Sequence, residues 1–134
     1  MAKDVEKPKC PMIVLHVEDD ADIQEITKIA LEMAGGFELH QCFTRQEAIE
    51  MASSLKADLL LLDVMLRTTS GTDLLRELRN LPTCASVPAI FMTARTRPEE
   101  QAEYISAGAV GLIEKPFDPL RLATQIKSIV DASV

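Results

Sequence analysis

The chain has 134 residues, of which 47% are hydrophobic and 26% are charged, and its 14 basic and 21 acidic residues give a net charge of −7. This composition is that of an ordinary globular domain and excludes disordered and collagen-like chains. The negative net charge argues against direct nucleic-acid binding, because such binding needs a basic surface. No stretch approaches the roughly 18 apolar residues of a membrane span, and the N-terminus has no apolar segment typical of a signal peptide.

The three cysteines, Cys10, Cys42 and Cys84, are an odd number without CxxC spacing. This argues against both a disulfide framework and a zinc site. Free thiols are typical of reducing compartments, so we expect a cytoplasmic protein.

Residues 1–11 are charged and contain two prolines, and we predict that they form a flexible leader. A strand is predicted over residues 13–17, followed by a helix whose stripe of Ile23, Ile26, Ala30 and Met33 faces the core and which ends at Gly35. A second strand, 37–42, leads to a second helix, for which Thr44 and Glu47 form a capping box.

The third strand, 59–62, consists of four leucines, a pattern typical of a strand buried on both faces of a parallel sheet. Ser70 and Asp73 form a similar cap for the third helix. A strand over 89–92 precedes a helix that begins at Pro98 and ends at Gly108. The last strand, 111–114, is followed by a helix over 119–130 that also begins at a proline.

Strands and helices alternate along the whole chain, which predicts a single α/β domain over residues 12–131. We expect a doubly wound, five-stranded parallel sheet with helices on both faces. The common strand order 2-1-3-4-5 places a crevice between the first and third strands, at their carboxyl ends.

Side chains that carry chemistry stand at these carboxyl ends: Glu18, Asp19, Asp63, Thr93 and Lys115. Three carboxylates held together repel one another unless a cation intervenes, and Mg²⁺ suits the site better than Ca²⁺ because no acidic loop has calcium-binding spacing. The three carboxylates, one divalent ion and one lysine give a neutral pocket that can admit a phosphoryl group. A carboxylate in such a pocket can attack phosphorus and form an aspartyl phosphate.

The stretches "VEDDADI", "DLLLLDVML" with Gly71 eight residues after Asp63, "FMTA" and "IEKPF" occur in this order. Together they resemble the receiver (REC) domain of bacterial two-component response regulators, the CheY-like superfamily, over residues 12–131. The resemblance implies a flavodoxin-like, CheY-like three-layer sandwich and a phosphoprotein that acts in a phosphorelay. It also implies a signalling phosphoacceptor rather than an enzyme, with at most slow self-phosphorylation and self-dephosphorylation. No output domain is expected in this chain.

The resemblance implies that Asp63 is the phosphoacceptor. It also implies that Mg²⁺ is bound by Asp19 and Asp63 directly, by Glu18 through water and by the backbone carbonyl of Met65. Thr93 would follow the phosphoryl group, and Lys115 would pair with it.

The chain departs from the family at several positions. The family's usual aromatic switch residue in the fifth strand is replaced by Leu112, and its common proline four residues after the phosphoacceptor is replaced by Arg67. Met65 and Arg95 occupy the two positions that commonly tune loss of the phosphoryl group, and neither orients water well, so we predict slow self-hydrolysis. The Lys115–Pro116 peptide bond is expected to be cis, as it is in the family.

The resemblance implies three kinds of partner or assembly. The phosphodonor is a sensor histidine kinase or a histidine phosphotransfer protein. A downstream protein binds the surface of the fourth helix, fifth strand and fifth helix, and homodimerisation on phosphorylation is left open. Neither nucleic acid nor a membrane is expected to bind directly.

Three alternatives remain to be weighed. A phosphatase of the haloacid dehalogenase type needs a second aspartate where Met65 stands, and a nucleotide-binding Rossmann domain needs a G-x-G-x-x-G motif that the chain lacks. A degenerate receiver that binds its partner without phosphorylation is compatible with Leu112 and Arg67, whereas the complete acidic site argues against it. His16 and His40 lie within predicted strands and are interpreted as structural residues rather than as ligands or phosphodonors.

Overall fold

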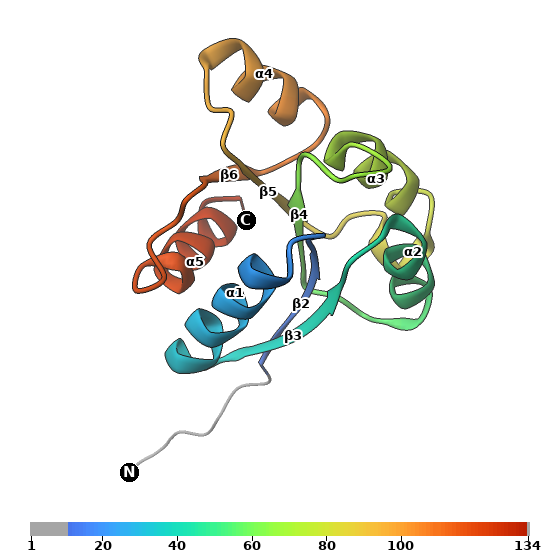
Figure 1. Cartoon of the computed structure of the whole chain (residues 1–134). Coiled ribbons are helices and arrows are strands. Elements are labelled where there is room, and N and C mark those ends of the chain that lie inside the picture. Colours follow the sequence, from blue (N-terminus) through green and yellow to red (C-terminus); the bar gives the residue numbers. More distant parts are fainter. Residues whose placement is uncertain (1–10, 134) are drawn as a thin grey trace.

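The computed structural model describes residues 11–133, so all but the last residue of the predicted leader, including Cys10, lies outside the described residues. The strands are β2 (Met12–Val17), β3 (Phe37–Cys42), β4 (Leu59–Asp63), β5 (Ala89–Thr93) and β6 (Gly111–Glu114). The helices are α1 (Ala21–Ala34), α2 (Arg45–Ser54), α3 (Gly71–Leu78), α4 (Pro98–Ser106) and α5 (Leu122–Ala132), with a short 3₁₀ turn at Pro82–Cys84 (Figure 1). No helix in this range is long and apolar enough to cross a bilayer.

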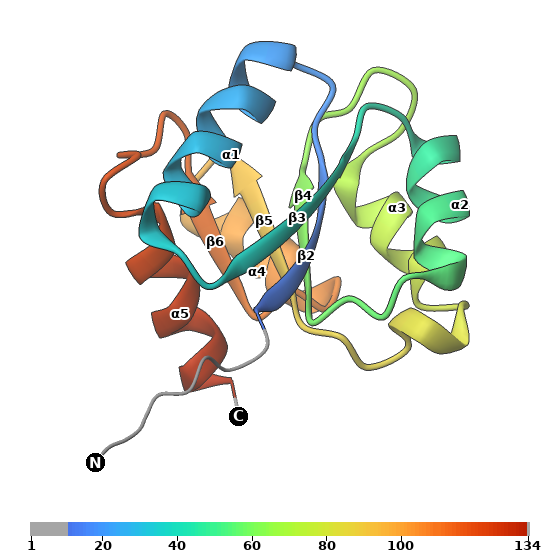
Figure 2. The same ribbon diagram turned by 90° about the horizontal axis from the view of Figure 1, so that it is seen from below.

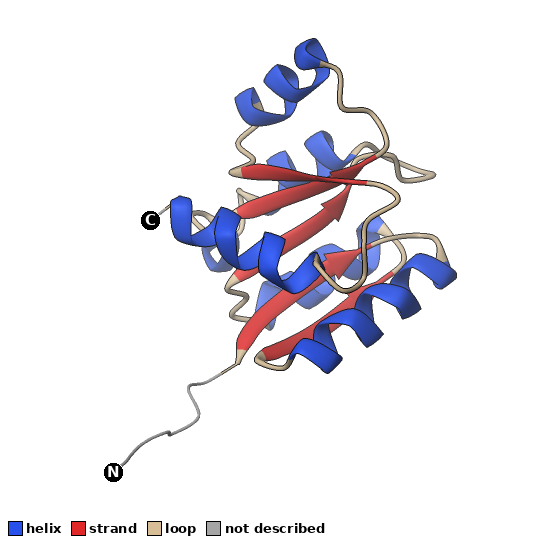
Figure 3. Ribbon diagram, turned by 90° about the vertical axis from the view of Figure 1, so that its left-hand side faces the viewer, coloured by secondary structure: helices blue, strands red, loops and turns tan. Residues whose placement is uncertain are grey.

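The five strands form one parallel sheet (Figure 3). Their order is β3-β2-β4-β5-β6, which confirms the predicted order 2-1-3-4-5. The register aligns the strand ends: Val17 lies beside Leu62, and Asp63 beside Met92. Since the strands are parallel, residues that end different strands meet at one edge of the sheet.

Helices cover both faces of the sheet (Figure 2). The core on the α1 and α5 side includes Val14, Leu61 and Ile126, and the core on the α2, α3 and α4 side includes Leu60, Leu74 and Tyr104. This is the three-layer sandwich that the alternating elements predict.

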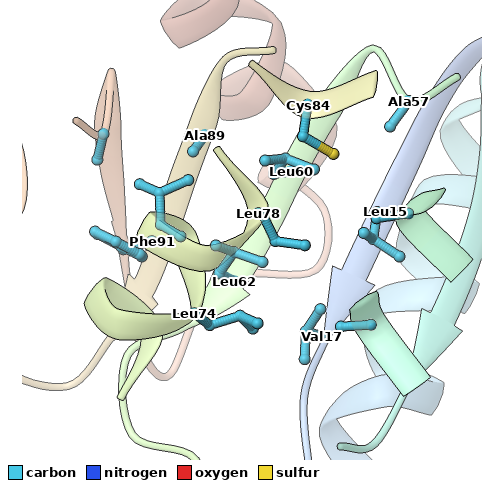
Figure 4. Close-up of a cluster of buried hydrophobic side chains, with 14 of the residues drawn as sticks. Leu15, Val17, Ala57, Leu60, Leu62, Leu74, Leu78, Cys84, Ala89 and Phe91 are labelled. Carbon is cyan, nitrogen blue, oxygen red and sulfur yellow. The ribbon is translucent and has the colours of Figure 1, made fainter. Parts of the chain in front are cut away.

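The four leucines of β4 alternate between the two cores, two in each. Leu60 and Leu62 point to the α2 and α3 side (Figure 4), whereas Leu59 and Leu61 point to the other side, and all four are fully buried. Each buried leucine side chain contributes about 1.5–3 kcal/mol of transfer free energy. This burial fixes the strand that carries Asp63 at its end.

Most predicted helix ends are confirmed. Thr44 and Ser70 accept hydrogen bonds from the third residues of α2 and α3, Pro98 is the first residue of α4, and Gly35, at φ 78°, terminates α1. Asp20 caps α1 with its carboxylate, which accepts hydrogen bonds from two backbone N–H groups.

The predicted buried stripe of α1 is wrong at two positions. Ile26 and Met33 are 44% and 74% exposed, and Ile23 is half-buried. Ala30 is buried as predicted, and the other buried residues of α1 are Gln24, Thr27 and Leu31. Gln24 can be buried because its side-chain amide donates hydrogen bonds to two backbone carbonyls.

The last helix begins later than predicted. Asp118 accepts a hydrogen bond from Leu120 N–H through its carboxylate and another from Arg121 N–H through its carbonyl. These bonds form a tight turn over residues 118–121, so the helical pattern starts only at Leu122.

Candidate functional site

Three carboxylates gather at the carboxyl edge of the sheet. Glu18 and Asp19 follow β2, and Asp63 is the last residue of β4, the neighbouring strand. One carboxylate oxygen from each lies within 4.8 Å of the others. Glu18 and Asp63 are buried, while the side chain of Asp19 is 19% exposed, so the cluster opens to solvent on the Asp19 side.

Lys115 joins two of these carboxylates. Its Nζ lies 2.8 Å from Glu18 Oε1 and 3.1 Å from Asp63 Oδ1. Its backbone N–H donates to the carbonyl of Thr93, and the Lys115–Pro116 peptide bond is cis, as expected. Burial by itself would lower the pKa of Lys115, but the hydrogen bond to Glu18 and the charge of Asp63 outweigh it and raise that pKa.

The cluster is short of positive charge. Three carboxylates and one ammonium group leave it with a formal net charge of minus two. Burial raises the pKa of Glu18 to about 7, and the charge of Asp63 adds to this effect, while the hydrogen bond from Lys115 opposes it. A divalent cation would compensate the net negative charge and, like Lys115, would favour the ionised form of Glu18.

The donor set fits Mg²⁺. Two oxygens bound to one octahedral Mg²⁺ lie about 3–4.2 Å apart, because each bond is about 2.1 Å long. Oxygens within 4.8 Å of one another therefore need only a small contraction, or a water molecule between the ion and one carboxylate.

Thr93 ends β5 at the same edge and is buried. Its hydroxyl accepts a hydrogen bond of 2.8 Å from Arg95 N–H, and it donates a longer one, of 3.4 Å, to Arg95 O. Thr93 is thus placed beside the cluster by the sheet, but its hydroxyl is held by the loop that leads to α4.

The loop between β4 and α3 packs against Asp63. Met65 N–H donates to Asp63 Oδ1 at 3.3 Å, and Gly71 N–H donates to Val64 O at 2.7 Å. A Cβ atom on Gly71 would lie 2.4 Å from the backbone oxygen of Asp63, so no larger residue fits without moving the loop. This close approach gives a physical reason for a glycine eight residues after Asp63.

Two residues at the site gained no role from the sequence. Gln24 donates to the carbonyls of Glu18 and Cys42 at 2.9 and 2.8 Å and so ties the ends of β2 and β3 together. Because α1 contains five other polar or charged residues, no signal in the sequence singled out Gln24. Arg67, identified only as a departure from the family, donates its backbone N–H to Asp19 Oδ2 at 2.9 Å.

Leu112 lies on β6 beside Phe91 and is half-buried. The ring of Phe91 packs edge-to-face against the buried Tyr104 of α4, with 5.6 Å between centroids. The aromatic contact on this side of the sheet therefore comes from α4 and β5 rather than from the position of Leu112.

An apolar hollow of about 310 Å³ lies next to Lys115, between α1 and the loop that follows β6. Its other lining residues are Ile23, Ile26, Ala94, Pro116, Phe117 and Pro119. The acidic cluster is thus bordered by exposed apolar surface of α1.

Comparison with known proteins gives one consistent picture. The family model described as "Response regulator receiver domain" matches residues 14–127. The phosphate regulon transcriptional regulatory protein PhoB of Pseudomonas aeruginosa is 36% identical over 117 residues, which are 87% of this chain and 51% of that protein. The probable transcriptional regulator ycf29 of Porphyra purpurea is 32% identical over 95 residues, 71% of this chain and 46% of that protein. The chain spans about half the length of these curated relatives.

Solved structures agree with the sequence relatives. The chemotaxis response regulator CheY4 of Vibrio cholerae superimposes with a TM-score of 0.82 at 26% identity, covering 89% of this chain and 98% of that one. A CheY-like response regulator receiver domain protein from Methanospirillum hungatei gives a TM-score of 0.79 at 30% identity, covering 91% of this chain and 95% of that one.

Proposed function

Because this chain belongs to the response regulator receiver domain family, we propose that Asp63 accepts a phosphoryl group from a phosphohistidine in a Mg²⁺-dependent reaction. The chain is the receiver domain of a two-component response regulator, a signalling protein with the CheY-like fold.

The contacts of Lys115 carry the proposal. Its ammonium group reaches both Asp63 and Glu18, at 3.1 and 2.8 Å, although Glu18 and Lys115 are 97 positions apart in the sequence. A cation held beside a buried carboxylate can neutralise the oxygens of a phosphoryl group transferred to that carboxylate.

The reaction exchanges one bond to phosphorus for another. A carboxylate oxygen of Asp63 attacks the phosphorus, the P–N bond to the donor imidazole breaks, and the released imidazole nitrogen takes up a proton. Asp19, Asp63, Glu18 through water, and the Met65 carbonyl would hold Mg²⁺, which when bound neutralises carboxylate and phosphoryl oxygens. Lys115 supplies the remaining positive charge.

The phosphoryl group would then shift a two-state surface. Thr93 would exchange its bonds to Arg95 for one to the phosphoryl group, and this would move the loop before α4. Leu112 would sense that movement on β6, within the surface of α4, β6 and α5 that meets a downstream protein.

The donor is proposed to be a protein, either a sensor histidine kinase or a histidine phosphotransfer protein. The apolar hollow beside Lys115 supports a protein donor, because it offers a docking surface next to the reacting carboxylate. We further propose that the domain works in the cytoplasm, and homodimerisation on phosphorylation remains open to test.

Reductive trapping tests the assignment of Asp63. After incubation with acetyl phosphate and Mg²⁺, borohydride reduces an aspartyl phosphate to homoserine, which peptide mass spectrometry locates. We expect conversion at Asp63 alone. Asp58, whose carboxylate accepts a hydrogen bond from Ile13 N–H, serves as an internal control. Conversion at another aspartate would contradict the assignment of Asp63, and no conversion at all would favour a receiver that acts without phosphorylation.

A further inference from the structure

The loop between β4 and α3 brings a second cation to the acidic cluster. The Arg67 backbone N–H donates to Asp19 Oδ2 at 2.9 Å, and its side-chain Nε lies 3.9 Å from the same oxygen. The Leu66 N–H bond to Thr69 O and the bridge between Met65 and Ser70 hold the loop in this position. The backbone of Arg67 is therefore fixed against Asp19, while its side chain is 86% exposed and free to reorient.

Formal charges show what this cation changes. Glu18, Asp19, Asp63 and Lys115 together carry minus two, which Mg²⁺ brings to zero and a phosphoryl group on Asp63 then makes minus one. With Arg67 counted, the loaded site is plus one before phosphorylation and neutral afterwards. Arg67 thus opposes Mg²⁺ in the free state and compensates the charge that phosphorylation adds.

We propose that Arg67 is a second positively charged residue of the phosphoryl site, which weakens Mg²⁺ binding in the unphosphorylated protein and strengthens retention of the phosphoryl group. This inference rests on the proposed phosphorylation of Asp63. Arg67 acts through its charge and is a positioning residue, because no reacting atom need touch it.

The exposure of the Arg67 side chain limits how much its charge can change the two affinities. Exposed charge pairs a few ångströms apart interact weakly in water, and a divalent ion doubles the interaction. At low salt we therefore expect a change of about three- to tenfold in affinity for Mg²⁺ and of about two- to threefold for a group that adds one charge. Because the guanidinium is exposed, the changes should shrink as ionic strength rises toward 1 M, where the Debye length is about 3 Å.

A purely structural role for Arg67 makes a different prediction. If the residue only held the loop through its ion pair with Asp19, its loss would weaken Mg²⁺ binding and phosphoryl binding together. Only an electrostatic role moves the two affinities in opposite directions.

The test compares Arg67→Ala with the charge-conserving Arg67→Lys. Arg76→Ala is the matched control, since that guanidinium is also exposed but pairs with Asp73 on α3. Mg²⁺ affinity is measured by isothermal titration calorimetry, and affinity for beryllofluoride, which adds one negative charge at Asp63, is measured by NMR at saturating Mg²⁺.

We expect Arg67→Ala to bind Mg²⁺ about three- to tenfold more tightly and beryllofluoride about two- to threefold more weakly, while Arg67→Lys and Arg76→Ala behave like wild type. Equal affinities in Arg67→Ala and wild type, or changes in the same direction, would overturn the inference but leave the proposed function standing. A wild-type protein that binds no beryllofluoride would overturn both.

Discussion

Replacing Gly71 by alanine tests the tight packing between α3 and the end of β4. Gly71 is the first residue of α3, where alanine should ordinarily stabilise. Alanine gains about 0.5–1 kcal/mol over glycine in a helix, partly by restricting the unfolded chain. On local propensity alone, Gly71→Ala would therefore increase the free energy of unfolding.

The contacts at Gly71 predict the opposite sign. The added Cβ would lie 2.4 Å from the Asp63 carbonyl oxygen and 2.9 Å from Val64 Cα, which are backbone atoms that cannot rotate away. Overpacking of this kind costs about 1–3 kcal/mol. Separating the segments also weakens the Gly71 N–H bond to Val64 O, which contributes about 0.5–1.5 kcal/mol. We therefore expect a net loss of about 1–3 kcal/mol, together with weaker Mg²⁺ binding because the backbone at Asp63 moves.

Gly111→Ala is the matched control. Its Cβ would lie 2.5 Å from Cγ2 of Ile129, a β-branched side chain with one preferred rotamer in a helix, so overpacking should also cost about 1–3 kcal/mol here. Because Gly111 does not contact the backbone of Asp63, we expect unaltered Mg²⁺ affinity. Urea denaturation and calorimetric Mg²⁺ titration measure both quantities. A Gly71→Ala protein at least as stable as wild type, with wild-type Mg²⁺ affinity, would refute the packing argument.

Three further predictions concern protonation, charge and hydrolysis. Burial and the charge of Lys115 lower the pKa of His16 to about 3, so between pH 6.5 and 3 the unfolded chain binds a proton that the native protein lacks. The free energy of unfolding should therefore decrease as the pH is lowered through this range, by up to about 1.4 kcal/mol per pH unit. In His16→Gln, the free energy of unfolding measured in urea should depend less steeply on pH, and an equal dependence would contradict this prediction. Lys115→Met leaves Glu18 and Asp63 without their cation and should lower the free energy of unfolding by about 2–4 kcal/mol at pH 7.5. The loss should be smaller when Mg²⁺ is present. A loss below about 0.5 kcal/mol in urea unfolding would contradict a stabilising role of these ion pairs. The phosphorylated wild type should keep a radioactive phosphoryl label for minutes or longer, and Met65→Asn should lose it faster. Loss of the label from the wild type within seconds would contradict slow self-hydrolysis.

The sheet and the grouping of the acidic residues could be predicted from the sequence. The run of leucines before Asp63 is apolar at every position, which specifies burial on both faces, and alternation with helices specifies parallel strands. Once the strands are parallel, Glu18, Asp63 and Lys115 must share one edge. For the strands, the structure adds that β2 begins one residue earlier, at Met12, and that Asp63 and Thr93 are the final residues of β4 and β5.

The buried face of α1 could not be predicted from hydrophobicity. Gln24 and Thr27 are buried in place of Ile26 and Met33, because the amide of Gln24 meets carbonyl groups of two other segments. Such partners are known only after the strand ends are placed. The isoleucines left outside contribute to the apolar surface beside Lys115.

The contact between Arg67 and Asp19 could likewise not be predicted from the sequence. It depends on the tight turn from Leu66 to Thr69, and residues 64–70 contain neither a glycine nor a proline that would specify its type. The start of α5 shifted for a related reason, since the hydrogen bonds of Asp118 favour a turn where Pro119 alone suggests a helix.

Intact mass spectrometry tests the central claim most directly. Wild type and Asp63→Asn are incubated with acetyl phosphate, with Mg²⁺ or with a chelator. We predict that wild type gains the mass of a single phosphoryl group only when Mg²⁺ is present, and that Asp63→Asn gains none under either condition. An adduct that persists in Asp63→Asn, or wild type that stays unmodified with Mg²⁺, would contradict phosphorylation of Asp63.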